Sequence, residues 1–292
     1  MENRNFISVI LPFYNAKAYL KSAIQSVLEQ SHKHWELIMV DDGSTDNSIL
    51  IAKKYTDNKK IFLLQHPKAV NKGVAESRAL AIRFSKGYYV SFLDSDDLYT
   101  PVKLETCLNA FVDNPEVILV HHAANFIDNS KKQKAFFNEF RFDKINTSYN
   151  FLDVDYLNNN HICNSSVVIK SEYLKKINNS FPHLFQYEDW INWILLAEHG
   201  NYYYLNEELC TYRFHENSST YKLLEEELKA MYAKFEMLMI LNKRVKGKEL
   251  KKNVEAAVSK QLEMIEDYYD FKNEREAGDT IKPLSLNRSF FK

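Results

Sequence analysis

The sequence "YYVSFLDSDD", residues 88–97, decides how the chain is interpreted, because an apolar run ends in three carboxylates within four positions. The apolar part, residues 88–93, predicts a short strand buried in a sheet. Asp94, Asp96 and Asp97 repel one another and are costly to bury without a positive charge among them. In an extended segment Asp94 and Asp96 point the same way, so they can converge on a divalent cation whose shell phosphate oxygens complete. The alternative is a solvated turn that caps the next helix.

Apolar runs alternate with helical patterns on the N-terminal side of this strand. Buried strands are predicted at residues 6–11, 35–40, 61–65 and 88–93, and helices within residues 15–31, 49–55 and 71–87. This alternation predicts an α/β fold with a mostly parallel central sheet flanked by helices. Ligands of such sheets bind beyond the carboxyl ends of the strands, which is the position of the aspartates.

The second half of the chain is less regular. Strands are predicted at residues 117–128 and 164–170, a helix at 188–200, and strand pieces within 201–215. Residues 129–160 are polar and predict long loops or a flap. We place one domain at residues 1–217 and a helical region at 218–292.

The C-terminal region predicts two amphipathic helices, within residues 223–244 and 249–271. Their apolar stripe, which packs on the first domain or on a second subunit of a homodimer, comprises Leu224, Leu228, Met231, Phe235, Leu238 and Ile265. The basic stretch "NKRVKGKELKK", residues 242–252, is either ordinary solvated charge or a contact with anionic lipid.

Composition narrows the function. The 292 residues are 45% hydrophobic and 14% aromatic, enough for a full core, and the formal net charge is −1. A chain with no basic excess is a poor candidate for binding nucleic acid. The cysteines are odd in number and widely spaced, and no apolar stretch approaches the ~20 residues of a membrane helix. We therefore expect buried thiols and a cytoplasmic protein, with peripheral contact at the inner face of the plasma membrane as an alternative.

Two further clusters follow the predicted strands. Asp41 and Asp42 begin "DDGSTDNS", where a carboxylate can accept hydrogen bonds from a ribose or a base, or where the segment forms a turn and a helix cap. A dinucleotide-binding domain is excluded because no GxGxxG follows the first strand. In "NKGVAESR", Lys72 and Arg78 can make charge-assisted bonds to a diphosphate, although a solvated surface is the ordinary interpretation.

Two later motifs carry chemistry. In "YEDWINW", Glu188 and Asp189 open a helix, where they either complement the helix dipole or supply a general base for an acceptor hydroxyl. Trp190 is more often a core residue than a floor on which a sugar stacks. In "YRFHENSS", His215 can be a further metal ligand.

Taken in order, these stretches resemble bacterial family 2 glycosyltransferases of the GT-A fold, from about Ile7 to Ser219. Each motif is loose, but the ordered set is specific. The resemblance implies a nucleotide-binding half at about residues 1–100, an acceptor half at about 101–217, and inverting transfer from a nucleotide diphosphate sugar. Carried over by position, it implies a nucleobase held by Pro12, Tyr14 and Asp42, and a donor site that includes Lys72, Arg78, Asp94 and Ser95.

The resemblance also implies the catalytic set. Asp94 and Asp96 match the family's DxD, with Asp94 towards the ribose and Asp96 on Mn²⁺ or Mg²⁺, to which His215 contributes. Asp189 matches the general base, and Glu188 and Trp190 lie near the acceptor sugar. The chain departs from the family at Ser77-Arg78-Ala79, where Ala-Arg-Asn is common.

The function expected is transfer of a hexose or N-acetylhexosamine from a UDP-sugar to a hydroxyl of a cell-surface polysaccharide, lipopolysaccharide or lipid-linked oligosaccharide. UDP is expected because it is the usual donor nucleotide of the family, and no residue of this sequence indicates it. Two rivals remain: a catalytically silent sugar-nucleotide-binding or scaffold protein on the same fold, and a phosphorelay receiver, which needs only ~120 residues. The sugar, the acceptor, the linkage and the oligomeric state are not encoded in any motif.

Overall fold

The computed structural model describes residues 4–128, 144–146, 157, 160–177 and 186–276. The loops expected at residues 129–160 therefore lie almost wholly outside the described part of the chain. Within it, the strands form one mixed sheet in the order β3-β2-β1-β4-β8-β6-β9-β5, with β7 pairing β9. The predicted α/β class is confirmed.

The first half of the sheet is parallel, as predicted. Its strands are β1 (Ile7–Phe13), β2 (Trp35–Asp41), β3 (Ile61–Gln65) and β4 (Tyr89–Phe92). The register pairs Ile7 with both Trp35 and Tyr89, so the carboxyl ends of these strands meet at one edge. The strands β1 and β2 are buried throughout, because helices cover both faces of a parallel sheet.

The second half adds antiparallel pairs. The short strand β8 (Val168–Lys170) lies antiparallel to β4 and to β6 (Val117–Asp128). Residues 201–215, predicted as strand pieces, instead contain one long strand, β9 (Asn201–Phe214), parallel to β6 with bulges in the pairing. The strands β5 (Leu98–Tyr99) and β7 (Lys144–Asn146) pair with β9 and were not predicted.

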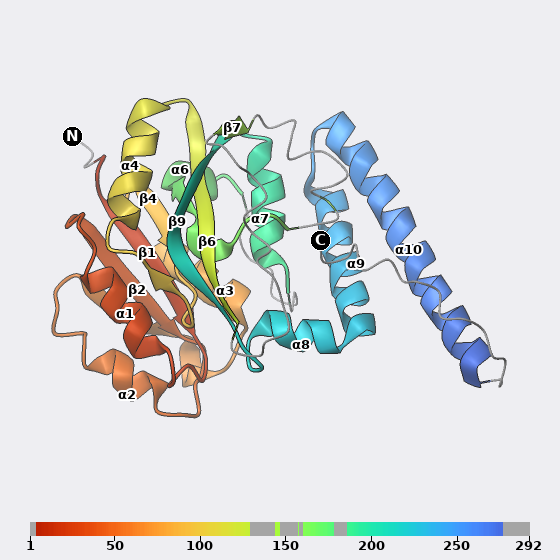
Figure 1. The fold of residues 1–292 in the computed structure, drawn as a ribbon, viewed down its shortest axis with the longest axis horizontal. Helices are drawn as coiled ribbons and strands as arrows, with labels where there is room; N and C mark the ends of the chain where they lie inside the picture. The colour runs from red at the N-terminus through yellow and green to blue at the C-terminus, as the bar shows by residue number, and fades with distance from the viewer. Residues whose placement is uncertain (1–3, 129–143, 147–156, 158–159, 178–185, 277–292) are drawn as a thin grey trace.

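Helices cover the two faces of the sheet (Figure 1). One core contains side chains of α1 (Leu20–Leu28) and α4 (Lys103–Asp113), and the other contains side chains of α3 (Val74–Phe84) and α7 (Glu188–Ala197). Short elements complete this part: α2 (Ser48–Lys53), η1 (Pro67–Ala69), η3 (Asn164–Ser166) and α6 (Ser171–Leu174).

The C-terminal region forms a further layer against α7. Its helices are α8 (Ser219–Glu225), α9 (Glu227–Arg244) and α10 (Lys248–Glu276). The first predicted helix is thus divided in two at Glu226, whose φ of −118° and ψ of 71° interrupt it. A third core joins Ile191 of α7 to Leu238 of α9 and Val254 of α10, so Leu238 of the predicted stripe packs on the first domain.

The expectation of buried thiols is met. Cys107, Cys163 and Cys210 are all buried free thiols. None of the described helices combines the length and the apolarity that crossing a bilayer requires.

Candidate active site

Asp42 is held by backbone N–H groups at the carboxyl edge of the sheet. It is 3% exposed, and its two carboxylate oxygens accept from the amides of Lys72 (2.7 Å) and Gly73 (2.9 Å). His66, buried beside it, has Nε2 3.6 Å from the same carboxylate and 2.9 Å from Ser77 Oγ. Burial is the main reason that the pKa of His66 is lowered, which favours the neutral ring.

The turn after Asp42 brings two loops together. Gly43 has φ of +75°, and a Cβ there would lie 2.7 Å from the carbonyl oxygen of Ala69. Only glycine allows this approach without a shift, so the loop that carries Lys72 and Gly73 can reach Asp42. Tyr14 follows β1 at the same edge and is 50% exposed, whereas Pro12 is buried within β1. An exposed ring beside a fixed carboxylate is a suitable surface for a nucleobase.

Arg78 connects the aspartate cluster to the later helix. Its guanidinium donates to Asp94 Oδ1 (2.5 Å) through Nη2 and makes an ion pair with Glu188 Oε1 through Nη1. Arg78 is 8% exposed and Glu188 4%, so this is a largely buried pair. The positive charge that the carboxylates require therefore comes in part from Arg78. The sequence placed Arg78 near a diphosphate, and here it also joins the two halves of the site.

Residues of η3 form hydrogen bonds with the aspartates of the cluster. Asn164 Nδ2 donates to Asp94 Oδ1 (2.9 Å), and the amide of Asp94 donates to Ser165 Oγ (3.0 Å). Ser165 Oγ in turn donates to Asp97 Oδ2 (2.5 Å). Asp97 is 1% exposed, and burial is the main reason that its pKa lies well above the usual range. Asp97 is thus a structural member of the cluster, anchored rather than open to a ligand.

Asp96 faces the end of β9. Its Oδ2 lies 3.1 Å from His215 Nε2, and the Arg213 guanidinium donates to its carbonyl oxygen (2.5 Å). The Tyr19 ring lies against both partners, 4.8 Å from the His215 ring and 4.5 Å from the Arg213 guanidinium carbon. The sequence-predicted pair of Asp96 and His215 is therefore brought together by β4 and β9.

A divalent cation fits this pair of donors. Neighbouring ligands of an octahedral Mg²⁺, bonded at about 2.1 Å, are about 3 Å apart, close to the separation seen between the carboxylate oxygen and the imidazole nitrogen. No group of three or more His, Cys, Asp or Glu side chains suited to a metal occurs among the described residues. Asp96 and His215 would thus hold the ion only together with ligand phosphate oxygens or water.

Asp189 lies in the first turn of α7, next to Glu188. Its Oδ1 accepts from the amide of Trp190 (2.8 Å). Burial is the largest cause of a raised pKa for Asp189, which the charge of Arg78 opposes and that of Asp94 reinforces. Tyr187, just before the helix, has φ of 69°, a conformation uncommon for a non-glycine residue. Asp189 is half-buried, and a carboxylate with a raised pKa has the properties of a general base.

The remaining sequence-predicted residues are Trp190, Lys72 and Ser95, and each has different surroundings. Trp190 is 4% exposed and belongs to the core shared with α9 and α10, which favours the core interpretation over a sugar-stacking floor. Lys72 contributes its backbone amide to Asp42, and its side chain is exposed. Ser95 is half-buried between the two aspartates, and its side chain makes no hydrogen bond to the described residues.

Sequence reasoning did not assign roles to Asn164, Ser165 or Tyr19. The first two belong to "NHICNSS", a polar stretch before a short strand, and polarity alone does not indicate a partner 70 residues away. Tyr19 opens an ordinary amphipathic helix. The antiparallel pairing of β8 with β4 brings η3 next to the aspartates, and this pairing is not visible in the sequence.

The chain is similar to a family model and to several named proteins. The model of "Glycosyl transferase family 2" matches residues 8–177. A teichuronic acid biosynthesis glycosyltransferase, TuaG of Bacillus subtilis, is 33% identical over 73% of this chain and 80% of its own length. The Escherichia coli enzyme WfgD, named as a UDP-Glc:α-D-GlcNAc-diphosphoundecaprenol β-1,3-glucosyltransferase, is 37% identical over 37% of this chain and 42% of its own.

Coverage differs among the relatives. An uncharacterized Haemophilus influenzae glycosyltransferase is 41% identical over 43% of this chain, and the match spans half of its length. The fold of Staphylococcus aureus TarS, residues 1–349 in complex with UDP, is similar, with a TM-score of 0.63 at 19% identity over 88% of this chain and 70% of that one. The family model covers the strands and loops that carry Asp42, Arg78 and the cluster of Asp94, Asp96 and Asp97. The chain therefore belongs to glycosyl transferase family 2, a family of sugar-transferring enzymes.

Proposed function

We propose that this chain transfers a hexose or N-acetylhexosamine from a UDP-sugar to a hydroxyl of a growing polysaccharide or lipid-linked glycan, with inversion. The observation that carries the proposal is the convergence of Asp42, the Asp94–Arg78–Glu188 cluster and the Asp96–His215 pair on one edge of the sheet. The names of TuaG and WfgD support a glycan acceptor, and WfgD and the TarS complex support UDP.

The donor binds along this edge from base to diphosphate. Tyr14 stacks on the base, which Pro12 borders, and Asp42 accepts from the nucleoside. Asp94 faces the ribose, with Lys72 and Ser95 along the same path. Asp96 and His215 hold Mn²⁺ or Mg²⁺, which supplies charge neutralisation for a departing diphosphate when it is bound.

Asp189 is the general base of the transfer step, and Glu188 and Trp190 support the acceptor side. The carboxylate takes the proton of the acceptor hydroxyl while that oxygen forms a bond to the anomeric carbon. The bond from the anomeric carbon to the diphosphate oxygen breaks, and the nucleoside diphosphate leaves with the electron pair. No covalent intermediate with the enzyme is formed.

The test replaces Asp189 by Asn, which keeps the shape and removes the base. We expect transfer to fall by ~10²-fold or more while the affinity for UDP with Mn²⁺, measured by calorimetry, is unchanged. Near-normal transfer would remove Asp189 from this role. UDP affinity that is indifferent to EDTA would contradict the metal site, and binding without any transfer by the wild type would favour the silent scaffold.

We also propose contact with anionic lipid through a basic turn between α9 and α10. This basic turn contains Lys243, Lys246, Lys248, Lys251 and Lys252. A cluster of this size near a membrane surface attracts anionic headgroups by about 1 kcal/mol per residue. Replacing Lys246, Lys248 and Lys252 by Gln is expected to reduce flotation with phosphatidylserine vesicles and to leave neutral vesicles unaffected. Equal flotation of the variant and the wild type would assign the cluster to solvated charge.

A further inference from the structure

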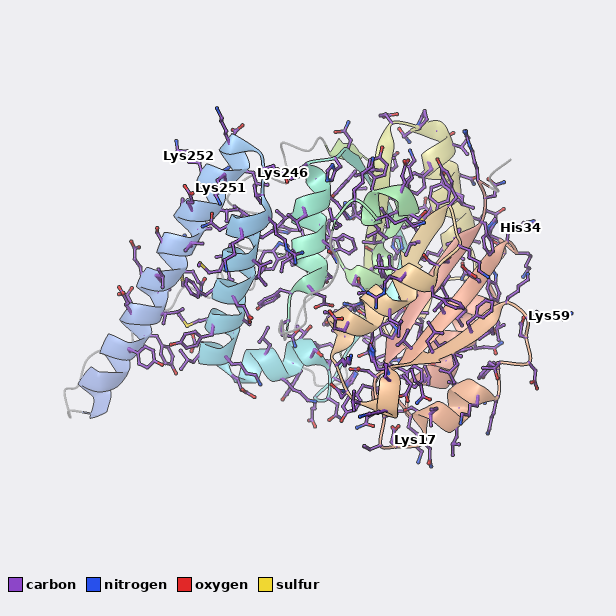
Figure 2. All side chains as sticks on the ribbon, turned by 180° about the vertical axis from the view of Figure 1, so that it is seen from behind. Lys17, His34, Lys59, Lys246, Lys251 and Lys252 are labelled. Carbon is purple, nitrogen blue, oxygen red and sulfur yellow. The ribbon has the colours of Figure 1, made fainter. Side chains whose placement is uncertain are left out.

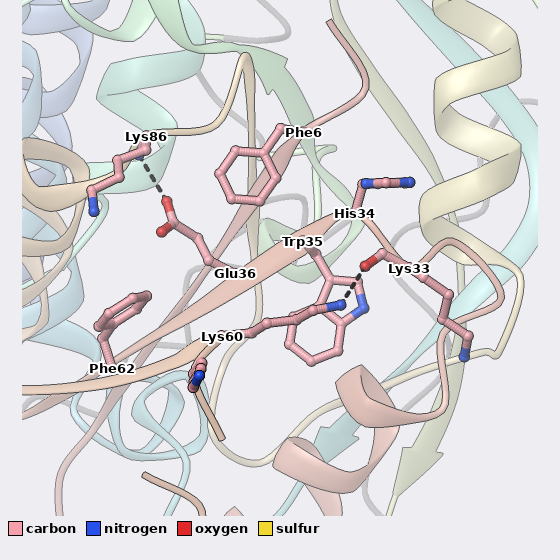
Figure 3. Close-up of a pocket in the computed structure, with 9 residues that line it drawn as sticks. Phe6, Lys33, His34, Trp35, Glu36, Lys60, Phe62 and Lys86 are labelled. Atoms are coloured by element: carbon pink, nitrogen blue, oxygen red, sulfur yellow. Dashed lines mark hydrogen bonds between the residues drawn. The ribbon is translucent and has the colours of Figure 1, made fainter. Parts of the chain in front are cut away.

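A cavity lies at the amino ends of the parallel strands, opposite the edge that carries the aspartates. Its volume is about 340 Å³, and it is lined by residues just before or at the start of the parallel strands. Phe6 precedes β1, Trp35 begins β2, Phe62 lies at the start of β3 and Lys86 precedes β4 (Figure 3). Seven strand residues at about 3.3 Å each separate the two edges by about 20 Å. The cavity is therefore distinct from the proposed donor site.

The charge around this cavity is unbalanced. Four lysines and one histidine line it, namely Lys33, Lys59, Lys60, Lys86 and His34, against a single carboxylate, Glu36. Glu36 is 3% exposed and already accepts from Ser8 Oγ (2.6 Å) and from the amide of Lys86 (2.8 Å). Within the described chain, no ion pair joins any of the four ammonium groups to a carboxylate. Four unpaired like charges around one cavity favour the binding of an anion.

The walls of the cavity are aromatic. Lys60 Nζ lies 5.3 Å from the centroid of the Trp35 ring, and Lys86 Nζ lies 5.7 Å from that of Phe62. Lys60 Nζ is also fixed by donating to the carbonyl oxygen of Lys33 (2.7 Å), as Figure 3 shows. Two ammonium groups are thus held against ring faces, between apolar walls and solvent.

Trp35 adds an unpartnered donor. It is 4% exposed, and its indole Nε1 is buried with no hydrogen-bond partner among the described residues. A buried N–H without a partner is costly, by about 1–3 kcal/mol, and such groups often mark a missing ligand or water. The cavity therefore combines aromatic surface and excess positive charge, and one of its lining residues, Trp35, carries a buried donor without a partner among the described residues.

We propose that the cavity binds a small phosphate ester that carries an aromatic group, the chemistry of a nucleoside monophosphate or an aryl phosphate. Lysine binds phosphate as a point charge, and a dianion best matches several ammonium groups around one hydrogen-bonded carboxylate. Trp35 and Phe62 contact the aromatic part. A volume above about 300 Å³ is in the range of small-molecule sites. The proposal does not depend on the donor chemistry at the other edge.

The test uses the full chain labelled with fluorotryptophan, whose three resonances are assigned by replacing each tryptophan with Phe. Trp35 reports on this cavity, whereas Trp190 and Trp193 are core residues of the other half. Phenyl phosphate, adenosine monophosphate, inorganic phosphate and phenol are titrated separately at millimolar concentrations. We expect a saturable shift of the Trp35 resonance with both phosphate esters, and a weaker response to inorganic phosphate and to phenol.

The matched variants each remove two lysines, one pair from the cavity and one pair from the basic turn, and Figure 2 shows Lys59 and Lys246 at opposite ends of the molecule. Lys59→Gln with Lys86→Gln is expected to weaken phenyl phosphate binding by roughly tenfold or more, because two charge-assisted contacts are lost. Lys246→Gln with Lys252→Gln removes the same charge far from the cavity and should leave the affinity unchanged. Absence of a saturable Trp35 shift, equal weakening by both double variants, or equal affinity for inorganic phosphate and phenyl phosphate would overturn the proposal.

Discussion

At the scale of single residues, Arg78 decides how the carboxylates of the site coexist. Asp94 and Glu188 belong to different halves of the fold, and the guanidinium forms an ion pair with each of them from a position that is 8% exposed. A lysine in its place would offer only one ammonium group, whereas the planar fork reaches two carboxylates at once. The arginine therefore links the strand that carries Asp94 to the helix that carries Asp189.

Replacing Arg78 by Met tests this link. The variant keeps the apolar stem but leaves two carboxylates without their counter-charge, and removal of one partner of a buried pair costs about 3–5 kcal/mol. We expect the free energy of unfolding, measured with urea, to fall by about that amount. Arg83→Met, on the exposed face of the same helix, is the control and should change it by less than about 0.5 kcal/mol. A change as small in Arg78→Met would show that the pair contributes little.

The residue types of the site were largely predictable, because chemistry restricts them. Asp42, Asp94, Asp96, Asp189 and His215 were all named from short motifs, and the structure gathers them at one edge. The partners were not predictable. Asn164 and Asp94, and likewise Arg213 and Asp96, are 70 or more residues apart in the sequence. No local sequence pattern indicates a contact between residues so far apart.

At the scale of elements, the same division holds. The parallel strands β1 to β4 and helices α1 and α3 were predicted because apolar periodicity and burial on both faces leave a strong signal. The two-residue strand β5 has no such signal, and β9 was expected in pieces because its buried and exposed residues do not alternate regularly. Its bulged pairing with β6 breaks the period of two on which strand prediction depends.

Helix α4 begins with a fully buried lysine, which is unusual for a charged residue. Lys103 Nζ donates to Ser91 Oγ (2.8 Å) and lies 3.5 Å from the centroid of the Tyr99 ring. Burial is the main cause that lowers the pKa of Lys103 to about 8. Because the unfolded chain binds more protons between pH 8 and 10.5, the contribution of this group to stability rises with pH across that window. Below pH 8 the full cost of the buried charge, about 3 kcal/mol, is present.

Replacing Lys103 by Met should remove this cost. We expect the free energy of unfolding at pH 7 to rise by up to about 3 kcal/mol, and the gain over the wild type to shrink between pH 8 and 10.5. Urea titrations across this range give the measurement, with the exposed Lys252→Met as a control that shows no such pH dependence. A loss of stability at pH 7 that is constant with pH would mean that the contacts with Ser91 and Tyr99 outweigh the cost of burial.

At the scale of the whole molecule, α7, the helix that carries the proposed general base, is shared between two layers. One side of α7 belongs to the core on the sheet, through Trp193 and Leu196, and the other belongs to the core formed with α9 and α10. The C-terminal helices therefore hold in place the helix whose first turn carries Glu188 and Asp189. A loss of packing at the α7–α9 contact should therefore lower the rate of sugar transfer, although no residue of α9 is assigned to the site.

Leu241→Ala in α9 tests this coupling. Leu241 is fully buried in the core with α7, so truncation should cost about 2–5 kcal/mol of unfolding free energy. We expect transfer by the remaining folded protein to fall as well, because α7 loses part of its support. UDP binding, which we propose at the carboxyl ends of β1 and β2, should be retained. Leu262→Ala, 41% exposed on α10, removes the same atoms from the surface and should change neither quantity. If Leu241→Ala lowers stability but leaves the transfer rate of the folded fraction at the wild-type value, the sheet alone positions Asp189 and the C-terminal helices serve another purpose.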